Sequence, residues 1–287
     1  MNTFLKYPSI TNHYQKDFVD KAKSLNCDFY ITEKLDGANL SICVNNGNIL
    51  AINSRNGEVS NDFYGINSID LKDFLKSINL KSFIVYGEIF GNKIQKRIKY
   101  SNLDNPNILF FDIYDLEQER FLNLKELKET LKDKMVPLLA ENLSLEDALS
   151  FDNDFISTLS SQSGNSSKAE GIIIKPEEDK YLGVHRVIIK KKHQSFLEIK
   201  SHKKQSNPIS FDEISSISFD GYININRIEA VKSKEIYNLP QDTARLINDV
   251  FNDAINEYQK LNQPLSKKEL SLLKKKYTHD IKKLIFS

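Results

Sequence analysis

Short runs rich in Ile, Val, Phe and Tyr recur through the first 191 residues of this 287-residue chain and then stop. Each run has the length and composition of a β-strand. We predict strands at residues 28–32, 40–44, 49–53, 83–90, 108–114, 171–175 and 187–191. The turn Asn45-Asn46-Gly47-Asn48 between two of them predicts a hairpin, because Asn and Gly tolerate positive φ.

Helical periodicity appears briefly at residues 71–78 and 122–131 and dominates after Pro208. Apolar residues from Ile247 to Leu261 fall on one helical face, and Ser266 with Glu269 predicts a capping box for a last helix. The polar stretch 160–167 (SSQSGNSS) predicts a surface loop rather than a linker, because strands resume after it. The predicted fold class is α+β at residues 1–206, with a small all-α domain at 207–287.

Composition excludes several classes of protein. Forty Lys+Arg against 39 Asp+Glu give a net charge of +1, so the chain is not uniformly basic, although a local basic groove remains open. The two cysteines, Cys27 and Cys43, form no CxxC pair, which argues against structural zinc and disulfides. With no apolar h-region or long apolar stretch, we expect an intracellular, cytoplasmic protein without membrane association.

Lys34 opens the sequence Lys34-Leu35-Asp36-Gly37, between two predicted strands. A lysine followed by Asp-Gly can be an ordinary exposed turn. The chemical alternative is a nucleophilic amine, which has to lose its proton and therefore needs cationic neighbours or burial.

Candidate neighbours lie in the strand at 187–192, where alternation places Lys190 and Lys192 on one face and Lys191 on the other. Two lysines on one face favour a bound anion such as phosphate. We expect Lys191 to be a solvated residue of the outer face.

Two carboxylates, Glu88 and Glu170, accompany strongly apolar strands, where an unpaired charge is costly. Each fits either a structural ion pair or a ligand for a hard cation or ribose hydroxyl. Arg55 ends a strand and can clamp phosphate. Phe110 and Phe111 lie in a predicted buried strand, where both rings fit core positions.

The order of these motifs is more specific than any one of them. Six motifs follow one another between residues 34 and 192: KxDG, SRNG, YGEIFG, FFDI, EGIIIKP and KKK. This order resembles the covalent nucleotidyltransferase superfamily of polynucleotide ligases and mRNA capping enzymes. Residues 1–205 further resemble the phage-type RNA ligase 2 family. The resemblance rests on YPSITNHY, Asn39, FYG, GNKIQK and the pattern K-x-K-x-x-x-F-x-E. Some phage members carry His where this chain has Asp36.

The resemblance implies an ATP-grasp-like adenylation domain of antiparallel sheets with flanking helices, and a role for each motif residue. Lys34 would be the nucleophile that takes AMP from ATP, and Glu170 would organise Mg²⁺ or Mn²⁺. The nucleotide-binding residues would be Glu33 and Phe111 at adenine, Asn39 and Glu88 at the ribose and α-phosphate, and Arg55, Lys175, Lys190 and Lys192 at the phosphates. The implied activity is ATP-dependent sealing of RNA 3′-OH and 5′-phosphate ends, in a duplex or bridged RNA, by a monomer.

Two other functions stay open, a small ATP-dependent DNA ligase and a catalytically inactive RNA-binding module. DNA ligases and capping enzymes usually continue into a small β-barrel, whereas this chain continues into helices. An inactive binder has no use for the intact lysine. Residues 199–287 carry a net charge of +4, which fits a solvated helix face or a surface for nucleic acid.

Overall fold

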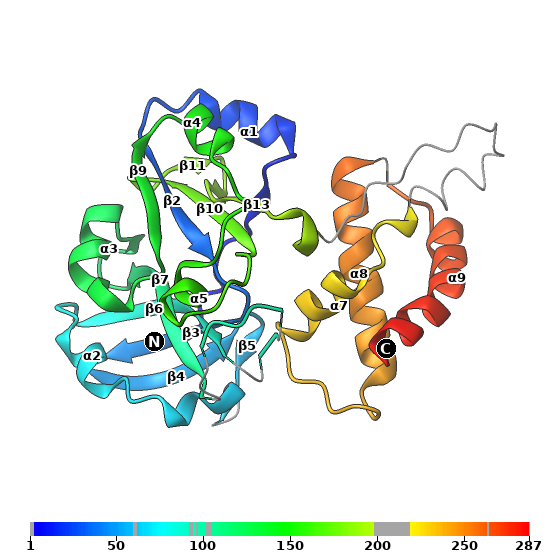
Figure 1. Ribbon diagram of the computed structural model, residues 1–287, viewed down its shortest axis with the longest axis horizontal. Helices are drawn as coiled ribbons and strands as arrows, with labels where there is room; N and C mark the ends of the chain where they lie inside the picture. Colours follow the sequence, from blue (N-terminus) through cyan, green and yellow to red (C-terminus); the bar gives the residue numbers. More distant parts are fainter. Residues whose placement is uncertain are drawn as a thin grey trace. The chain divides into compact units, whose positions relative to one another are not determined.

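The structure, a computed structural model, describes residues 3–59, 62–91, 94–95, 97–101, 105–197, 219–262 and 264–286. The chain divides into two compact units, Met1–His193 and Gln194–Ser287, which we describe separately (Figure 1). The predicted boundary at residues 206–207 lies outside the described residues, as do Asn92, Lys93, Lys96 and Glu198 of the family patterns.

The first unit holds a five-stranded sheet in the order β1-β13-β10-β2-β9 and a six-stranded sheet in the order β5-β4-β3-β6-β7-β8. All of these pairs are antiparallel except β1–β13. The strands of the five-stranded sheet are β1 (Thr11–Asn12), β2 (Phe29–Lys34), β9 (Leu138–Leu143), β10 (Gly171–Pro176) and β13 (Ile189–Lys192). Those of the six-stranded sheet are β3 (Ala38–Asn45), β4 (Asn48–Ser54), β5 (Gly57–Glu58), β6 (Ser82–Phe90), β7 (Asn107–Asp115) and β8 (Arg120–Phe121). A small hairpin adds β11 (Tyr181–Leu182) and β12 (His185–Arg186).

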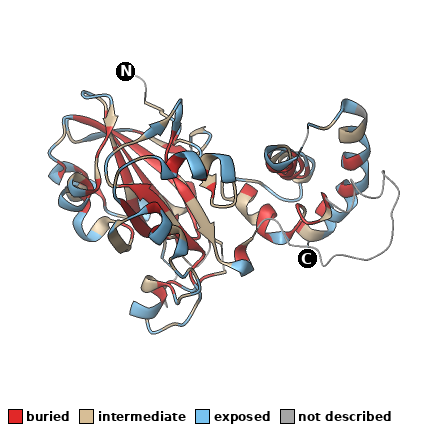
Figure 2. Cartoon of the chain, turned by 90° about the horizontal axis from the view of Figure 1, so that it is seen from above, coloured by how far each residue is buried: buried red, intermediate tan, exposed pale blue. Residues whose placement is uncertain are grey.

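Helices cover the outer face of each sheet. The five-stranded sheet packs against α1 (Lys16–Lys23) and α4 (Leu145–Ser150), and the six-stranded sheet packs against α2 (Lys72–Ser77), α3 (Leu124–Leu131) and the 3-10 turn Phe63–Ser68. Further short elements are α5 (Thr158–Gln162) and the 3-10 turn Lys132–Lys134. The inner faces enclose a third cluster that includes Tyr7, Tyr86 and Ile188, with Phe111 and Ile173 packed against it. Figure 2 shows the buried residues concentrated along these strands.

The second unit has its own core. After a 3-10 turn at Gln194–Phe196 it contains α7 (Ile225–Lys232), α8 (Thr243–Leu261) and α9 (Lys267–Ile285). The predicted apolar face of α8 is buried here from Ile247 to Tyr258, together with Phe219 and Tyr277, whereas Leu261 at its end is exposed. The capping box of Ser266 and Glu269 begins α9, as predicted.

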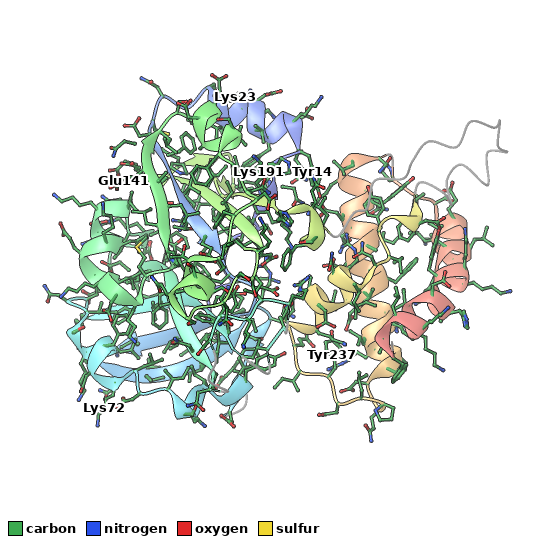
Figure 3. The ribbon with its side chains drawn as sticks, viewed as in Figure 1. Tyr14, Lys23, Lys72, Glu141, Lys191 and Tyr237 are labelled. Atoms are coloured by element: carbon green, nitrogen blue, oxygen red, sulfur yellow. The ribbon has the colours of Figure 1, made fainter. Side chains whose placement is uncertain are left out.

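The predicted strands and fold class are confirmed, and two local predictions are corrected. Residues 160–167 are not entirely loop, because Ser157 caps α5, which extends to Gln162. Lys191 is not a freely solvated residue: it is half-buried, and its Nζ donates to the carbonyl oxygens of Leu149 and Phe151, 2.9 and 2.8 Å away. These carbonyls lie at the end of α4, where the last turn of a helix leaves acceptors unpaired. Figure 3 labels Lys191.

Candidate active site

Lys34 and Lys192 meet at one carboxylate because of the register of three strands. Gly171 of β10 pairs with Lys34 of β2 on one side and with Lys192 of β13 on the other. Lys34 Nζ lies 2.6 Å from Glu170 Oε2, and Lys192 Nζ lies 2.9 Å from Glu170 Oε1. Two of the four predicted lysines, Lys34 and Lys192, therefore form one cluster with the predicted metal residue Glu170.

Gly171 makes this close approach possible. Its φ is +149°, and a Cβ at this position would lie 2.2 Å from the carbonyl oxygen of Lys191. Gly37 has a similar role in the turn after Lys34, where a Cβ would lie 2.3 Å from the carbonyl oxygen of Ile89. A larger residue at either position would separate the strands that carry the site.

The cluster controls the charge of Glu170. Its side chain is only 3 % exposed, and burial opposes ionisation, but Lys192, Lys34 and Arg97 outweigh burial and lower the pKa of Glu170 to about 2. Glu170 is therefore a carboxylate at neutral pH. Of the two lysines that contact Glu170, Lys34 is the more exposed, with 20 % of its side chain exposed against 9 % for Lys192.

Two further carboxyl groups near Lys34 behave differently. Burial raises the pKa of Glu88 to about 8, although Lys34 opposes the shift. Burial and the charge of Glu170 raise the pKa of Asp36 to about 6, against the effect of Arg97. Glu88 pairs in register with Asn39, and both predicted residues are half-buried.

Glu33 is almost completely buried, with 2 % of the residue exposed. Its Oε2 accepts a hydrogen bond from the backbone N–H of Thr158 at 2.9 Å. Its Oε1 has no hydrogen-bond partner among the residues that the structure describes. A buried acceptor without a donor is costly, so this atom is suited to a ligand N–H.

The remaining predicted residues are spread along the sheets. Lys190 lies two residues before Lys192 on the same face of β13 and pairs in register with Ile173. Arg55 follows the last residue of β4 and is half-buried. The ring of Phe111 is half-buried and makes an edge contact with Tyr7, with ring centroids 5.1 Å apart.

Lys175 is not brought to the Glu170 cluster. Its Nζ lies 3.0 Å from Asp112 Oδ2 and 2.8 Å from the carbonyl oxygen of Phe111. Arg186 and the Tyr7 hydroxyl bind the same carboxylate, each at 2.6 Å. These contacts form a buried ion-pair network, which differs from the phosphate role predicted for Lys175.

Sequence reasoning also missed Arg97. Its Nε donates to Asp36 Oδ2 at 3.1 Å, and its charge acts on Glu170. The available signal was the sequence after GNKIQK, where Arg97 is the next residue.

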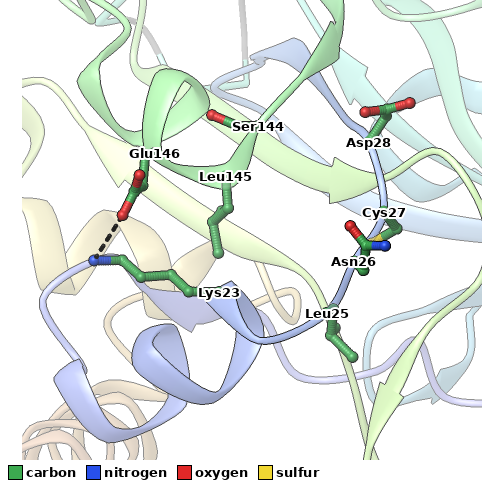
Figure 4. A pocket seen from close by; sticks show the side chains of 8 residues that line it. All are labelled: Lys23, Leu25, Asn26, Cys27, Asp28, Ser144, Leu145 and Glu146. Atoms are coloured by element: carbon green, nitrogen blue, oxygen red, sulfur yellow. Dashed lines mark ion pairs between the residues drawn. The ribbon is translucent and has the colours of Figure 1, made fainter.

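Two of the hollows formed by the described residues lie outside the cluster. One, of about 440 Å³, is lined by residues that include Leu109, Leu138 and Thr158, the last of which binds Glu33. The other, of about 430 Å³, lies between the end of α1 and the start of α4 (Figure 4). It contains Cys27 and the Lys23–Glu146 pair at 3.9 Å, and none of the predicted site residues.

Residues 28–192 match the RNA ligase family profile. The chain belongs to the RNA ligase family. The match spans the motifs from Lys34 to Lys192 and therefore the whole Glu170 cluster. No helix within the described residues has the length and apolarity needed to cross a membrane.

Solved structures of RNA ligase-family proteins share this fold. A Naegleria gruberi RNA ligase variant with ATP and Mn superposes with a TM-score of 0.52 at 21% identity, covering 68% of this chain and 58% of that chain. An apo variant of the same enzyme gives 0.51 at 22% identity, over 69% and 59%. The enzyme with PPi gives 0.51 at 22%, over 69% and 58%. The chain thus spans less than two thirds of the length of these ligases.

Proposed function

We propose that this protein is an ATP-dependent RNA ligase in which Lys34 carries AMP as a covalent intermediate. The observation that carries this proposal is the Lys34–Glu170–Lys192 cluster at the end of the five-stranded sheet, inside the segment that matches the RNA ligase family. Ligase-type nucleotidyl transfer needs an amine nucleophile beside groups that stabilise phosphate charge.

Glu33 fits the adenine base. Its buried Oε1 has no hydrogen-bond donor among the described residues. The exocyclic amine of adenine can supply that donor. Phe111 supplies a half-buried ring for stacking. Asn39 and Glu88 pair in register on β3 and β6, and we assign them to the ribose and α-phosphate. ATP is named as bound to a Naegleria gruberi RNA ligase variant of similar fold.

Glu170 fits a divalent metal that arrives with the nucleotide. Among the described residues, no set of three or more His, Cys, Asp or Glu side chains is arranged to hold a metal ion. Mg²⁺ does not require such a set, since it commonly binds one or two carboxylates together with substrate phosphates and water. Mg²⁺ or Mn²⁺ held by Glu170 would supply charge neutralisation at the phosphates.

The chain's own residues then act on ATP. The neutral amine of Lys34 attacks the α-phosphorus, the N–P bond forms, and the bond to the β-phosphate breaks with release of pyrophosphate. The amine proton leaves to solvent. Lys192 and Lys190 neutralise phosphate charge from β13, and Arg55 grips phosphate from the end of β4. A direct role for Lys175 at phosphate would require it to leave Asp112.

The second and third steps would use RNA ends. AMP would move from Lys34 to an RNA 5′-phosphate, and a 3′-hydroxyl would then displace it and seal the strand. We propose a nick in duplex RNA as the substrate and membership of the phage-type RNA ligase 2 group, on the sequence patterns that this chain shares with it. Asp36 departs from the His of some phage members.

The test of the first step is transfer of label from α-labelled ATP to protein with magnesium present. Lys34→Ala should abolish the transfer, because no other group at this point replaces the amine. Lys128→Ala is the matched control, since Lys128 also forms an ion pair, with Glu141, but lies outside the site. Labelled Lys34→Ala protein would contradict the proposal.

The second step is tested by supplying nicked RNA and nicked DNA duplexes to the labelled protein. Sealing of RNA supports the RNA ligase, and sealing of DNA alone would favour the DNA ligase alternative. A folded wild-type protein that binds RNA but takes no label would favour the inactive binding module.

We further propose that the helical unit engages nucleic acid through exposed lysines of α9. Lys274, Lys275 and Lys276 lie together on its surface. Replacing all three by Ala should leave label transfer intact and weaken nick sealing as salt is raised, since lysine–phosphate contacts release counterions. Replacing the exposed Lys16, Lys21 and Lys23 of α1 is the charge-matched control. Equal sealing by both triple variants across a salt titration would make this α9 cluster a solvated face.

A further inference from the structure

Three side chains from one short part of the chain bind the turn that follows Lys34. Gln95 Nε2 donates to the carbonyl oxygen of Gly37 at 3.1 Å. Arg97 Nε donates to Asp36 Oδ2 at 3.1 Å, and its Nη2 binds the other carboxylate oxygen. The hydroxyl of Tyr100 accepts a hydrogen bond from the backbone N–H of Asp36 at 2.6 Å. The turn is therefore held through its backbone and through its only acidic side chain.

The Arg97–Asp36 contact is a partly buried, bidentate ion pair. Asp36 is 2 % exposed, and the side chain of Arg97 is 22 % exposed. Arg97 also donates to Gln95 Oε1 at 2.6 Å, which fixes the plane of the guanidinium. A planar guanidinium with this many partners has little freedom to rotate, so it fixes the carboxylate in position as well as in charge.

Glu33, the residue before Lys34, is held by a chain of hydrogen bonds that also reaches Lys99. Glu33 binds the first N–H of α5 through Thr158. Two residues later, the fully buried Ser160 donates from Oγ to the carbonyl oxygen of Lys99 at 2.9 Å. Lys99 N–H in turn donates to Ser167 Oγ at 3.0 Å, and Ser167 N–H donates to Ser160 Oγ at 3.1 Å.

Glu33 before Lys34 and the turn at Asp36 and Gly37 after it are thus tied to Gln95 and residues 97–100, with the SSQSGNSS stretch as the link on the Glu33 side. We propose that Gln95, Arg97, Lys99, Tyr100 and Ser160, the Lys34 brace, orient Lys34 for attack on the nucleotide, and that Arg97 is the principal positioning residue. The brace rests on the proposed function, because it concerns the same adenylylation step. It acts through the backbone around Lys34, and Arg97 itself transfers no group.

Orientation of this kind has a recognisable kinetic effect. A nucleophile displaced by about 1 Å loses about 100-fold in rate while its substrate still binds. We therefore expect Arg97→Ala to lower the rate of AMP transfer to Lys34 at saturating ATP by about 100-fold, with little change in the ATP concentration for half-maximal rate. Arg97→Lys keeps the charge but loses the fork, and should recover part of the rate.

The experiment is single-turnover AMP transfer with the full chain, read together with thermal melting. Tyr100→Phe removes one acceptor atom from the brace and should reduce the rate less than Arg97→Ala does. Ser160→Ala is compared with Ser82→Ala, which also removes a buried serine hydroxyl, one bound to Asn45 far from the turn. Arg97→Ala combined with Asp36→Asn should be no slower than the more severe single variant, because both remove one contact.

Several results would overturn the brace. Wild-type transfer by Arg97→Ala would do so, as would a loss matched by the fraction unfolded in the melt. A raised half-saturating ATP concentration with an unchanged maximal rate would make Arg97 a nucleotide ligand instead. If the wild-type protein takes no AMP at all, the proposed function fails and the brace with it, a result distinct from these three.

Discussion

Two carboxylates in the first unit are each bound by two cationic side chains, but they differ in how completely the protein encloses those partners. Glu170 binds Lys34 and Lys192, whereas Asp112 of β7 binds Lys175 and Arg186. In both places burial opposes ionisation, and the cations outweigh it, so the pKa of each carboxyl group is lowered. From charge alone the two sites are equivalent.

Their surroundings separate them. At Asp112, which is fully buried, Tyr7 adds a third donor, and Arg186 also pairs with Asp179 at 2.5 Å and lies 3.7 Å from the centre of the Phe121 ring. Every partner there is bound on several sides by protein. At Glu170, Lys34 is one-fifth exposed, and the proposed function requires it to exchange this carboxylate for the nucleotide. We therefore expect the enclosed Asp112 network to stabilise the fold and the more open Glu170 cluster to serve the proposed chemistry.

The largest expected effect comes from neutralising each carboxylate separately. Asp112→Asn leaves buried Lys175 without a carboxylate partner and leaves Arg186 with Asp179 alone, which should cost about 3–5 kcal/mol of unfolding free energy. This corresponds to a fall in Tm of roughly 6–20 °C. Glu170→Gln should keep Tm closer to that of the wild type and lower AMP transfer by about 100–1000-fold. Melting and label transfer on both variants measure the contrast.

The contrast would fail if the two variants exchanged these phenotypes. A Glu170→Gln protein with full AMP transfer would remove Glu170 from the chemistry. An Asp112→Asn protein with unchanged Tm would show that its network is not structural.

Phe111 lies beside both regions, since its carbonyl oxygen belongs to the Lys175 network and its ring is half-buried. If the ring stacks on adenine, Phe111→Ala should weaken ATP binding by about 1–3 kcal/mol with a modest change in Tm. Titration calorimetry with ATP measures the first and melting the second. Unchanged ATP affinity with a large loss of Tm would assign the ring to the core between the sheets.

Glu88 is a third carboxyl group for this comparison, and its pKa is raised, whereas those of Glu170 and Asp112 are lowered. Because burial raises the pKa of Glu88 to about 8, the folded state keeps a proton that the unfolded state releases above its ordinary pKa of 4.5. The free energy of unfolding should then fall as pH rises from about 4.5 to 8. Glu88→Gln cannot titrate, so its Tm relative to wild type should increase by a few degrees across this window.

Thermal melts between pH 5 and 8.5 check this, with Glu117→Gln as control, because Glu117 is exposed and pairs only with the surface residue Lys81 among described ion pairs. A Tm difference for Glu88→Gln that stays constant with pH would show that Glu88 is ionised throughout.

The sequence predicted what depends on local pattern. Alternation placed Lys190 and Lys192 on one face, and the register of β10 and β13 confirms it. Edge strand β9 was missed because Ala140, Glu141 and Asn142 weaken its strand signal. Lys191 was misassigned because alternation gives the direction of a side chain but not what covers that face, here the end of α4.

Contacts between distant segments could not be predicted from pattern. Lys175 and Asp112 are 63 residues apart, and Arg97 and Asp36 are 61 apart. From the sequence, Lys175 was predicted as a phosphate ligand and Arg97 was given no role. Only the fold shows that Lys175 and Arg97 already have carboxylate partners.

The most direct test of the account is to locate the AMP. Wild-type protein is incubated with ATP and magnesium and then digested. The masses of its peptides are measured by mass spectrometry under conditions that preserve the phosphoramidate. We predict one AMP on the peptide that contains Lys34 and none on those containing Lys175, Lys190 or Lys192. AMP on another lysine, or protein that stays unmodified while sealing RNA, would contradict the assignment of Lys34 as the nucleophile.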